Sequence, residues 1–360
     1  MATTPGLSSP APQGAASSPR SGTASPGSPT SAPNPENVGV LEADDTLNAD
    51  DGDSALGFPT DASDTTSIRS FITRYREENG RTYHAYKSGG DYNYLQHNLF
   101  LMTLGNKLWA CPHINEQELK RVLDAGTGTG IWAMEFADEH PSTKVVGTDL
   151  SPIQPSMVAP NVEFFVDDLE QEWTFVEKFD FIYARMMTGS IKNWPRFFEQ
   201  AYAYVLISLL GVRLIRAYLE VADAMFPVAC DDGSFPEDSA LQKWAKLVVK
   251  ASSMIGAPIN SALQYKQQMM DAGFLDVHQV EYKWPINAWA KDTKHKQLGA
   301  WSLINNLQGV AAFSYMLFTA VLGFSKEEIE VMLVDVRKDI KNTNYHGYWP
   351  VYMVYGRKPE

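Results

Sequence analysis

The chain has 360 residues, of which 44% are hydrophobic, and this is enough apolar material for one large domain or two small ones. Its formal net charge of −13 is uneven, because residues 1–66 hold nine acids and one base and leave 34 acids and 29 bases in the rest. This balance argues against a basic stripe that binds nucleic acid directly, and two cysteines argue against a disulfide framework or a four-cysteine zinc site.

Residues 1–66 are predicted to form a disordered tail, because their first 35 residues are rich in Ala, Ser, Pro, Gly and Thr and bury too little apolar surface to offset chain entropy. A docking segment for a regulatory protein partner is the alternative. The N-terminus lacks the apolar run of a signal peptide, so we expect a cytoplasmic or nuclear protein that is not secreted. The longest apolar stretch, 310–324, is too short to span a bilayer, so it predicts a buried helix and no membrane partner.

The folded part is predicted to span residues 67–360, with a helical cap at 67–118 and a core at 119–360. Apolar residues at helical spacing predict helices at 67–79 and 94–109. Beyond them strands and helices alternate, which indicates a mainly parallel sheet with helices on both faces and ligands at the carboxyl ends of the strands. The predicted strands are 121–125, 144–149, 162–167, 179–184, 217–222, 277–282 and 348–355, and the predicted helices are 131–140, 194–206, 238–255, 263–272, 300–321 and 326–342.

A glycine loop follows the first of these strands, in the stretch RVLDAGTGTGIW at 121–132. Gly126, Gly128 and Gly130 stand at every second position, so the third glycine comes one residue too early for the dinucleotide fingerprint. No lysine follows Gly130, which excludes the phosphate loop of nucleoside triphosphatases. A nicotinamide-dependent dehydrogenase is therefore disfavoured, while a purely structural turn stays an alternative.

Acidic residues end three neighbouring strands. Asp124 closes the first, Asp149 closes the second, and Asp167 and Asp168 follow the third. An acid at the second position can accept hydrogen bonds from ribose hydroxyls, and one at the third can accept from the exocyclic amine of adenine. Each acid alone could be a turn residue or a helix cap, but together with the glycine loop they favour a nucleoside-binding site.

These motifs resemble those of class I S-adenosylmethionine-dependent methyltransferases, and in particular the fungal LaeA-like methyltransferases. The resemblance covers about residues 70–360 and leaves the tail outside it. It implies an α/β, Rossmann-like fold with a mostly parallel seven-stranded sheet, an N-terminal helical cap and C-terminal helical additions. The stretches that carry it include REENGRTYHAY (76–86), LQHNLFLMTLGNKL (95–108), GTDLSPIQP (147–155), NVEFFVDDLEQEW (161–173), FDFIYARMM (179–187) and DDGSFPEDSALQKWAKL (231–247).

The resemblance also implies roles for the site residues toward S-adenosyl-L-methionine, which carries no phosphate and is met by carboxylates rather than lysines. Asp124 would anchor the amino group of its methionine part, and Asp149 would bind the ribose hydroxyls. Leu150 would lie against the adenine. The remaining implied cofactor residues are the loop residues Gly126, Thr127, Gly128 and Gly130, the adenine-reading Asp167 or Asp168, and Arg185 where the cofactor meets the acceptor pocket.

Methyl transfer is a direct displacement that depends mainly on alignment, although a hydroxyl or amine acceptor can also need a base. His97, in the predicted cap, is the first candidate for this catalytic role, and His346 is the second; a packing role is the alternative for both. No His and Cys spacing suggests a metal site, and neither cysteine has the context of a nucleophile. The aromatic residues expected either in the core or around a flat small-molecule acceptor are Trp284, Trp289, Trp301, Phe313 and Tyr315.

Two segments depart from the family pattern. The loop 87–94 is shorter than usual, and 205–217 replaces the usual Lys-Pro-Gly-Gly turn before the fifth strand, either as an insertion or as a gene-model error. The sequence thus predicts a methyltransferase acting on a small molecule in fungal secondary metabolism. The alternatives are a nuclear regulator of secondary-metabolite genes that acts through partner proteins, and a degenerate methyltransferase that serves as a scaffold.

Overall fold

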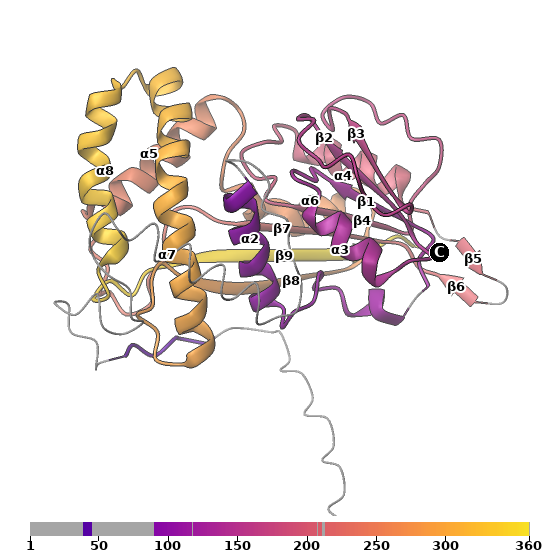
Figure 1. Ribbon diagram of the computed structural model, residues 1–360, viewed down its shortest axis with the longest axis horizontal. Coiled ribbons are helices and arrows are strands. Elements are labelled where there is room, and N and C mark those ends of the chain that lie inside the picture. The colour runs from indigo at the N-terminus through magenta and orange to yellow at the C-terminus, as the bar shows by residue number, and fades with distance from the viewer. Residues whose placement is uncertain (1–38, 45–89, 117, 207, 211–212, 360) are drawn as a thin grey trace, which may run out of the picture. The chain divides into compact units, whose positions relative to one another are not determined.

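The computed structural model describes residues 39–44, 90–116, 118–206, 208–210 and 213–359 (Figure 1). The predicted tail therefore lies outside the described residues except for 39–44. The helix predicted at 67–79 also lies outside them, as do residues 87–89 of the predicted loop 87–94. Residues 90–94 of that loop are helical, so the prediction of a loop is wrong there.

The fold is built on a seven-stranded sheet in the order β3-β2-β1-β4-β7-β9-β8. β1 pairs in parallel with β2 and β4, while β9 runs antiparallel to both β7 and β8. The predicted mostly parallel seven-stranded fold is confirmed. The strands are β1 (Arg121–Ala125), β2 (Lys144–Asp149), β3 (Val162–Val166), β4 (Phe181–Arg185), β7 (Tyr218–Ala224), β8 (Leu275–Pro285) and β9 (Tyr348–Arg357).

Helices cover both faces of this sheet, which explains why β1 and β4 are almost continuously apolar and buried. On one face, Trp132 of α3 (Ile131–Glu139) stacks on Tyr183 of β4 with ring centroids 4.2 Å apart. On the other face, α4 (Trp194–Tyr204) and α6 (Tyr265–Asp271) pack their aromatic and methionine side chains on β4, β7 and β9. Two short 3-10 helices, η1 (Pro112–Glu116) and η2 (Ser261–Gln264), complete the connections.

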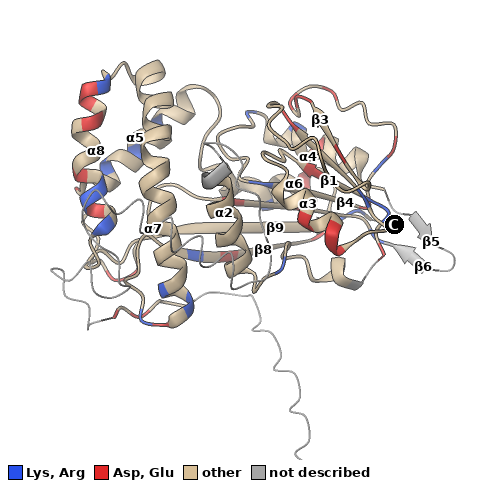
Figure 2. Cartoon of the chain, in the orientation of Figure 1, with Lys and Arg blue, Asp and Glu red and all other residues tan. Residues whose placement is uncertain are grey.

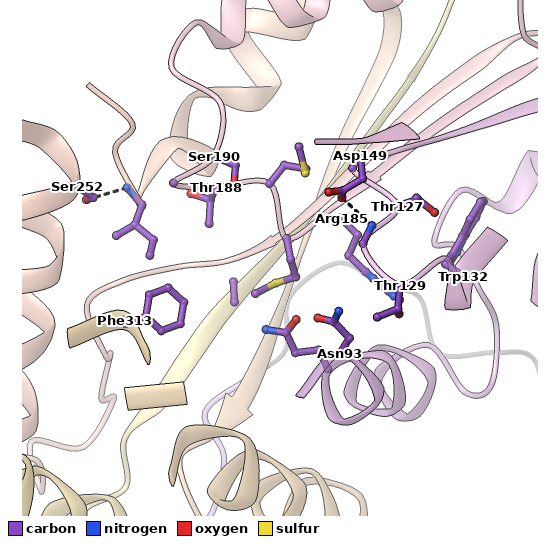
Figure 3. A pocket seen from close by; sticks show the side chains of 18 of the residues that line it. Asn93, Thr127, Thr129, Trp132, Asp149, Arg185, Thr188, Ser190, Ser252 and Phe313 are labelled. Atoms are coloured by element: carbon purple, nitrogen blue, oxygen red, sulfur yellow. Dashed lines mark hydrogen bonds between the residues drawn. The ribbon is translucent and has the colours of Figure 1, made fainter. Parts of the chain in front are cut away.

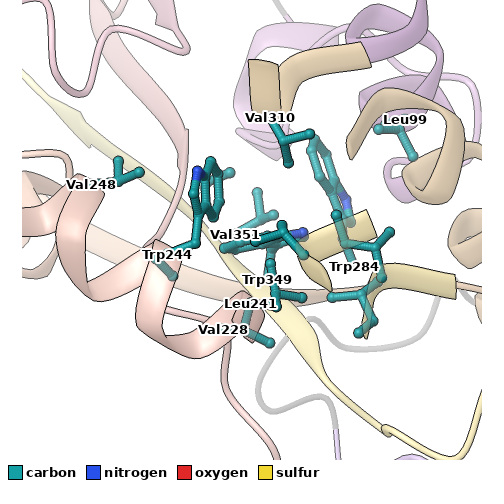
Figure 4. Close-up of a cluster of buried hydrophobic side chains, with 14 of the residues drawn as sticks. Leu99, Val228, Leu241, Trp244, Val248, Trp284, Val310, Trp349 and Val351 are labelled. Atoms are coloured by element: carbon teal, nitrogen blue, oxygen red, sulfur yellow. The ribbon is translucent and has the colours of Figure 1, made fainter. Parts of the chain in front are cut away.

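A second hydrophobic cluster joins the remaining helices to one end of the sheet (Figures 1 and 4). Two of its buried tryptophans donate hydrogen bonds through their N–H groups, Trp244 to the Ser314 hydroxyl at 2.8 Å and Trp284 to the Thr103 hydroxyl at 2.7 Å. The first bond joins two of these helices to each other, and the second joins a helix to the strand β8. The helices are α2 (Gly90–Thr103), α5 (Ala240–Met254), α7 (Thr293–Ser314), the π-helix η3 (Tyr315–Leu322) and α8 (Lys326–Lys341).

Among the helix boundaries that differ from the prediction, two have clear local reasons. α2 ends at Thr103 rather than at 109, because Gly105 and Asn106 take left-handed backbone angles with φ of +64° and +65°. α7 begins at Thr293 rather than at 300, because Asp292 caps it by accepting a hydrogen bond from the His295 amide at 3.0 Å.

The described parts of the unusual segment 205–217 lie outside the main sheet. α4 ends without a glycine, because Val205 turns extended and forms a bridge with Phe179. The chain then forms a separate two-stranded sheet from β5 (Ser208–Leu210) and β6 (Arg213–Ile215), and β7 enters the main sheet in register with β4. The fifth strand of the core is thus formed without the Pro-Gly-Gly turn. The choice between an insertion and a gene-model error stays open.

Residues 39–44, which fall within the predicted disordered tail, lie in an ordered position against the domain. Ala43 forms an antiparallel bridge with Ala290, and the Asp44 amide donates to the Trp289 carbonyl at 3.0 Å. The acids of this segment meet bases of the domain, since Glu42 pairs with Lys291 at 3.1 Å. Backbone pairing and ion pairs therefore order a stretch whose composition alone predicts mobility.

Basic and acidic side chains interleave along α8, where Lys338 pairs with Asp335 at 2.9 Å (Figure 2).

None of the helices in the described part of the chain combines the length and the apolar character that a membrane span requires.

Candidate cofactor and acceptor site

A cavity of about 340 Å³ opens at the carboxyl ends of β1, β2 and β4, within the size range of small-molecule sites (Figure 3). Asp149 and Arg185 lie on one side of it, and Phe313 lies on the other (Figure 3). Its other lining residues include Asn93, Gln96, Asp124, Gly126, Thr127, Gly128, Thr129, Trp132, Met186, Met187, Thr188, Gly189, Ser190, Phe226, Ser252, Ile255, Ile259, Met316 and Leu317.

The loop after β1 requires its glycines for both conformation and space. Gly126, Gly128 and Gly130 have φ of +76°, +57° and +80°, which side chains rarely adopt. A Cβ atom on Gly126 would lie 2.0 Å from the Met187 sulfur, and one on Gly130 would lie 2.4 Å from the Phe164 ring. Gly126 and Gly128 line the cavity, so the loop presents bare backbone to a ligand.

Asp149 links the glycine loop to the end of β2. Its carboxylate accepts hydrogen bonds from the Gly128 amide at 2.8 Å, drawn as a dashed line in Figure 3, and from the Ser151 amide at 2.9 Å. The side chain is half-buried and lines the cavity, so a ligand hydroxyl can reach it. Leu150 beside it is exposed and is not among the cavity residues, so its adenine role stays a prediction.

Asp124 is the most deeply buried carboxyl group of the cavity lining, with 3% of its surface exposed. The Thr127 hydroxyl donates to it at 2.5 Å. Burial raises the pKa of Asp124 to about 6, although the Thr127 hydrogen bond and the charge of Arg185 act in the opposite direction. A cationic group bound in the cavity would relieve this desolvation cost.

Arg185 is oriented by His97 and Glu135, neither of which lines the cavity. The guanidinium donates to His97 Nδ1 at 3.1 Å and lies 4.8 Å over the Phe100 ring. Because a guanidinium can only donate, His97 Nδ1 is unprotonated, and Nε2 carries the proton that it donates to Glu135 at 2.8 Å. The geometry therefore gives His97 a positioning contact with Arg185, and its catalytic role stays a prediction.

Asp167 and Asp168 lie at the end of β3 but are not among the cavity residues. The Asp168 carboxylate accepts hydrogen bonds from the Glu170 amide at 3.0 Å and from the Gln171 side chain at 3.2 Å. Asp167 accepts from the Asp168 amide at 2.9 Å. Both thus cap a turn, and adenine recognition by either one stays a prediction.

The aromatic residues of the C-terminal third divide between cavity and core. Phe313 lines the main cavity, and Trp284 lines an adjoining pocket of about 50 Å³ together with Phe226 and Trp349. Trp289 and Trp301 are buried in the core. Two further residues lie away from both pockets, as Tyr315 donates a hydrogen bond to Glu330 and His346 bonds to Asp232 at 2.5 Å.

Sequence reasoning missed the loop after β4, which supplies the cavity residues 186–190. Met186 has a φ of +56°, unusual for a residue with a long side chain. The available signal was its position, because the loop directly follows Arg185, the predicted site residue at the end of β4. Asp223 near the end of β7 was not predicted either; it is buried and accepts a hydrogen bond from the Thr188 amide at 3.1 Å. Within the described ranges, no group of three or more His, Cys, Asp and Glu side chains could hold a metal ion.

Comparison with known proteins gives a match of residues 95–279 to a family model described as a methyltransferase domain. The chain is 34% identical over 316 residues to methyltransferase pytC of Aspergillus terreus, covering 85% of this chain and 94% of that protein. It is 36% identical to the probable methyltransferase tdiE of Emericella nidulans, covering 74% of this chain and 80% of that protein. It is 29% identical to the secondary metabolism regulator LAE1 of Cochliobolus heterostrophus, covering 79% of this chain and 94% of that protein.

Proposed function

The chain belongs to the methyltransferase family, and from this premise we propose that it methylates a small-molecule acceptor in fungal secondary metabolism. Its cofactor is S-adenosylmethionine. The observation that carries the proposal is the continuity of the site, because the carboxylate-lined cavity shares Phe226 and Phe313 with the aromatic pocket beside it.

The residues of the cavity fit this cofactor. Among the residues that the structure describes, its charged lining consists of Asp124, Asp149 and Arg185 without a lysine, which suits a ligand that has an amino group, ribose hydroxyls and no phosphate. Asp124 would meet the amino group, Asp149 would accept from the ribose, and the bare backbone at Gly126 and Gly128 would allow close approach. When bound, the cofactor supplies a methyl group on a positively charged sulfur.

The acceptor end of the site is apolar and aromatic. The rings of Phe226 and Phe313 lie 6.0 Å apart, and those of Phe226 and Trp349 lie 4.6 Å apart. Such walls favour a flat apolar molecule, which they would hold by packing and by excluding water. The protein's task is then to align the acceptor atom with the methyl group.

A second candidate function is a regulator that acts through partner proteins, in the cytoplasm or the nucleus. It is favoured by the similarity to LAE1, which extends over 94% of that regulator. In this case the methyl acceptor would be a protein rather than a small molecule.

One experiment tests both candidates. The full chain is titrated calorimetrically with S-adenosylmethionine beside Asp149→Ala, with Asp138→Ala as a control because Asp138 is exposed on α3 away from the cavity. We expect Asp149→Ala to weaken binding at least tenfold and Asp138→Ala to bind as the parent does. The parent is then incubated with methyl-labelled cofactor and a fungal metabolite extract or nuclear protein extract. Label in metabolites supports the enzyme, label only in proteins supports the regulator, and no cofactor binding contradicts both.

A further inference from the structure

A row of hydroxyl groups leads from the cavity to a buried carboxyl group. Thr188 lines the cavity, and its Oγ1 lies 3.0 Å from Ser261 Oγ. Ser261 Oγ lies 2.9 Å from the Tyr265 hydroxyl, which donates to Asp223 Oδ2 at 2.7 Å. Ser261 and Tyr265 come from η2 and α6, and Asp223 from β7, so three separate elements converge to build the row.

The hydrogen bonds in this row have a defined direction when Asp223 is ionised. The Tyr265 hydroxyl donates its one proton to the carboxylate, so it can only accept from Ser261. Ser261 donates its own proton to Tyr265 and therefore accepts from Thr188. The carbonyl of Pro258 is a weaker second acceptor for Thr188, at 3.4 Å. The lone pairs of Thr188 Oγ1 are therefore left to accept a hydrogen bond from a donor in the cavity.

Asp223 is suited to receive a proton at the far end. It is completely buried, and burial raises its pKa to about 7, although the hydrogen bond from Tyr265 and those from the amides of Thr188 and Met187 lower it. The titratable groups around it are Tyr265 from α6 and Tyr352, its register partner on β9, with Glu281 beyond Tyr352 on β8. Its carboxylate is thus a base near neutral pH without direct contact with solvent.

We propose that this row carries a proton from the methyl acceptor to Asp223, and that the acceptor is therefore a hydroxyl-bearing small molecule. The inference rests on the proposed function. Thr188 would contact the acceptor directly. Ser261, Tyr265 and Asp223 would act through Thr188, as positioning residues.

The step balances without any other reactant. The acceptor oxygen forms its bond to the methyl carbon, and the electron pair of the broken carbon–sulfur bond stays on sulfur, which loses its positive charge. The acceptor's proton passes to Thr188 as the protons of Thr188, Ser261 and Tyr265 each move one oxygen further. Asp223 ends as a neutral carboxylic acid, and after the product leaves the proton passes back along the row to water that enters the cavity.

Asp223 also holds the loop after β4 through the Thr188 amide, so its removal would not separate the relay from a structural role. Tyr265→Phe does separate them, because it breaks the row at one oxygen and leaves the amide contact and the ring packing in place. Tyr204→Phe is the matched control, since Tyr204 likewise donates its hydroxyl proton to an oxygen, the backbone carbonyl of Trp173, and lies away from the cavity.

The test measures transfer of labelled methyl to a fungal metabolite extract by the full chain. We expect Tyr265→Phe and Ser261→Ala to lower the rate at pH 7 by at least thirtyfold, and Tyr204→Phe to stay within twofold of the parent. Acetylating the extract, which blocks hydroxyl groups, should remove the labelled product. The parent's rate should rise with pH through an apparent pKa near 7, and Tyr265→Phe should lose this rise.

Binding of S-adenosylhomocysteine, measured by calorimetry, provides the readout that does not depend on turnover. We expect Tyr265→Phe to bind it within twofold of the parent. Loss of this binding would assign Tyr265 a structural role and overturn the relay, and so would a Tyr265→Phe rate equal to that of the parent. A parent that binds the cofactor product but labels no metabolite overturns the proposed function itself, which distinguishes the two failures.

Discussion

At the scale of single residues, the site depends on groups placed where they are costly to the fold. Every second residue of the glycine loop, from Gly126 to Gly130, has a positive φ angle. Asp124 is buried at the cavity wall, and burial raises its pKa. Both features give the ligand access to bare backbone and to a poorly solvated carboxyl group. Desolvation of a carboxyl group is typical of binding sites, where a ligand compensates for it, whereas glycine adopts positive φ without strain.

The first prediction concerns Gly130, at the start of α3. Gly130→Ala forces a side chain into a left-handed conformation and against the Phe164 ring. We expect it to lower the free energy of unfolding by about 2 kcal/mol and to weaken cofactor binding as the loop shifts. Gly233→Ala is the matched control, since Gly233 has a φ of +76° with nothing within 4 Å of the added Cβ, and it should cost only about 1 kcal/mol. Equal losses in both variants, by chemical denaturation, would show that the Phe164 contact is unimportant.

The second prediction distinguishes the two roles of His97. If it positions Arg185, then His97→Ala and Arg185→Ala should each weaken S-adenosylhomocysteine binding about tenfold, and the double variant should lose little more than either one, because the two side chains act as a unit. Calorimetric titration of the three variants measures this coupling. Unchanged binding by His97→Ala together with a large loss of methyl transfer would instead support the catalytic role.

At the scale of elements, the sequence predicts what is set locally. The strands, the glycine loop and the acid of β2 follow from alternation and strand-end positions, and the observed sheet confirms that fold. The far wall of the cavity is set by long-range packing of α5, α7 and the loop after β4, which no local pattern encodes. The pair Tyr265 and Asp223 illustrates this, because 42 residues separate two groups that share a hydrogen bond.

The third prediction concerns the junction between the cap and the sheet. Glu220 of β7 is buried and accepts hydrogen bonds from the amides of Ala110 at 2.8 Å and Cys111 at 2.7 Å. Burial raises its pKa from 4.5 to about 7, so its contribution to stability is full below pH 4.5 and is lost as the pH rises through 7. The loss is on the order of 3 kcal/mol. Glu220→Gln should remove this part of the pH dependence of the unfolding free energy, and an unchanged pH profile would contradict it.

The fourth prediction concerns the small β5–β6 sheet. It lies outside the seven-stranded sheet, in which β7 already pairs in register with β4. Replacing residues 207–216 by a Lys-Pro-Gly-Gly turn should therefore leave cofactor affinity within twofold, and should not lower the melting temperature. A variant that no longer binds the cofactor would mean that this segment helps to place β7 against β4.

At the scale of the whole domain, segment 39–44 joins parts that are distant in the sequence, and its removal is the last prediction. Lys283 is buried and pairs with Asp231 at 2.6 Å. It also donates a hydrogen bond to the Gly39 carbonyl at 3.2 Å, so segment 39–44 contacts this ion pair. A chain lacking residues 1–44 should therefore melt several degrees below one lacking only 1–34, since the lost bridge, hydrogen bonds and ion pairs are together worth about 1–2 kcal/mol. The shift should shrink in high salt if ion pairs dominate and persist if backbone pairing does. Equal melting temperatures for the two chains would show that the contacts of 39–44 do not stabilise the domain.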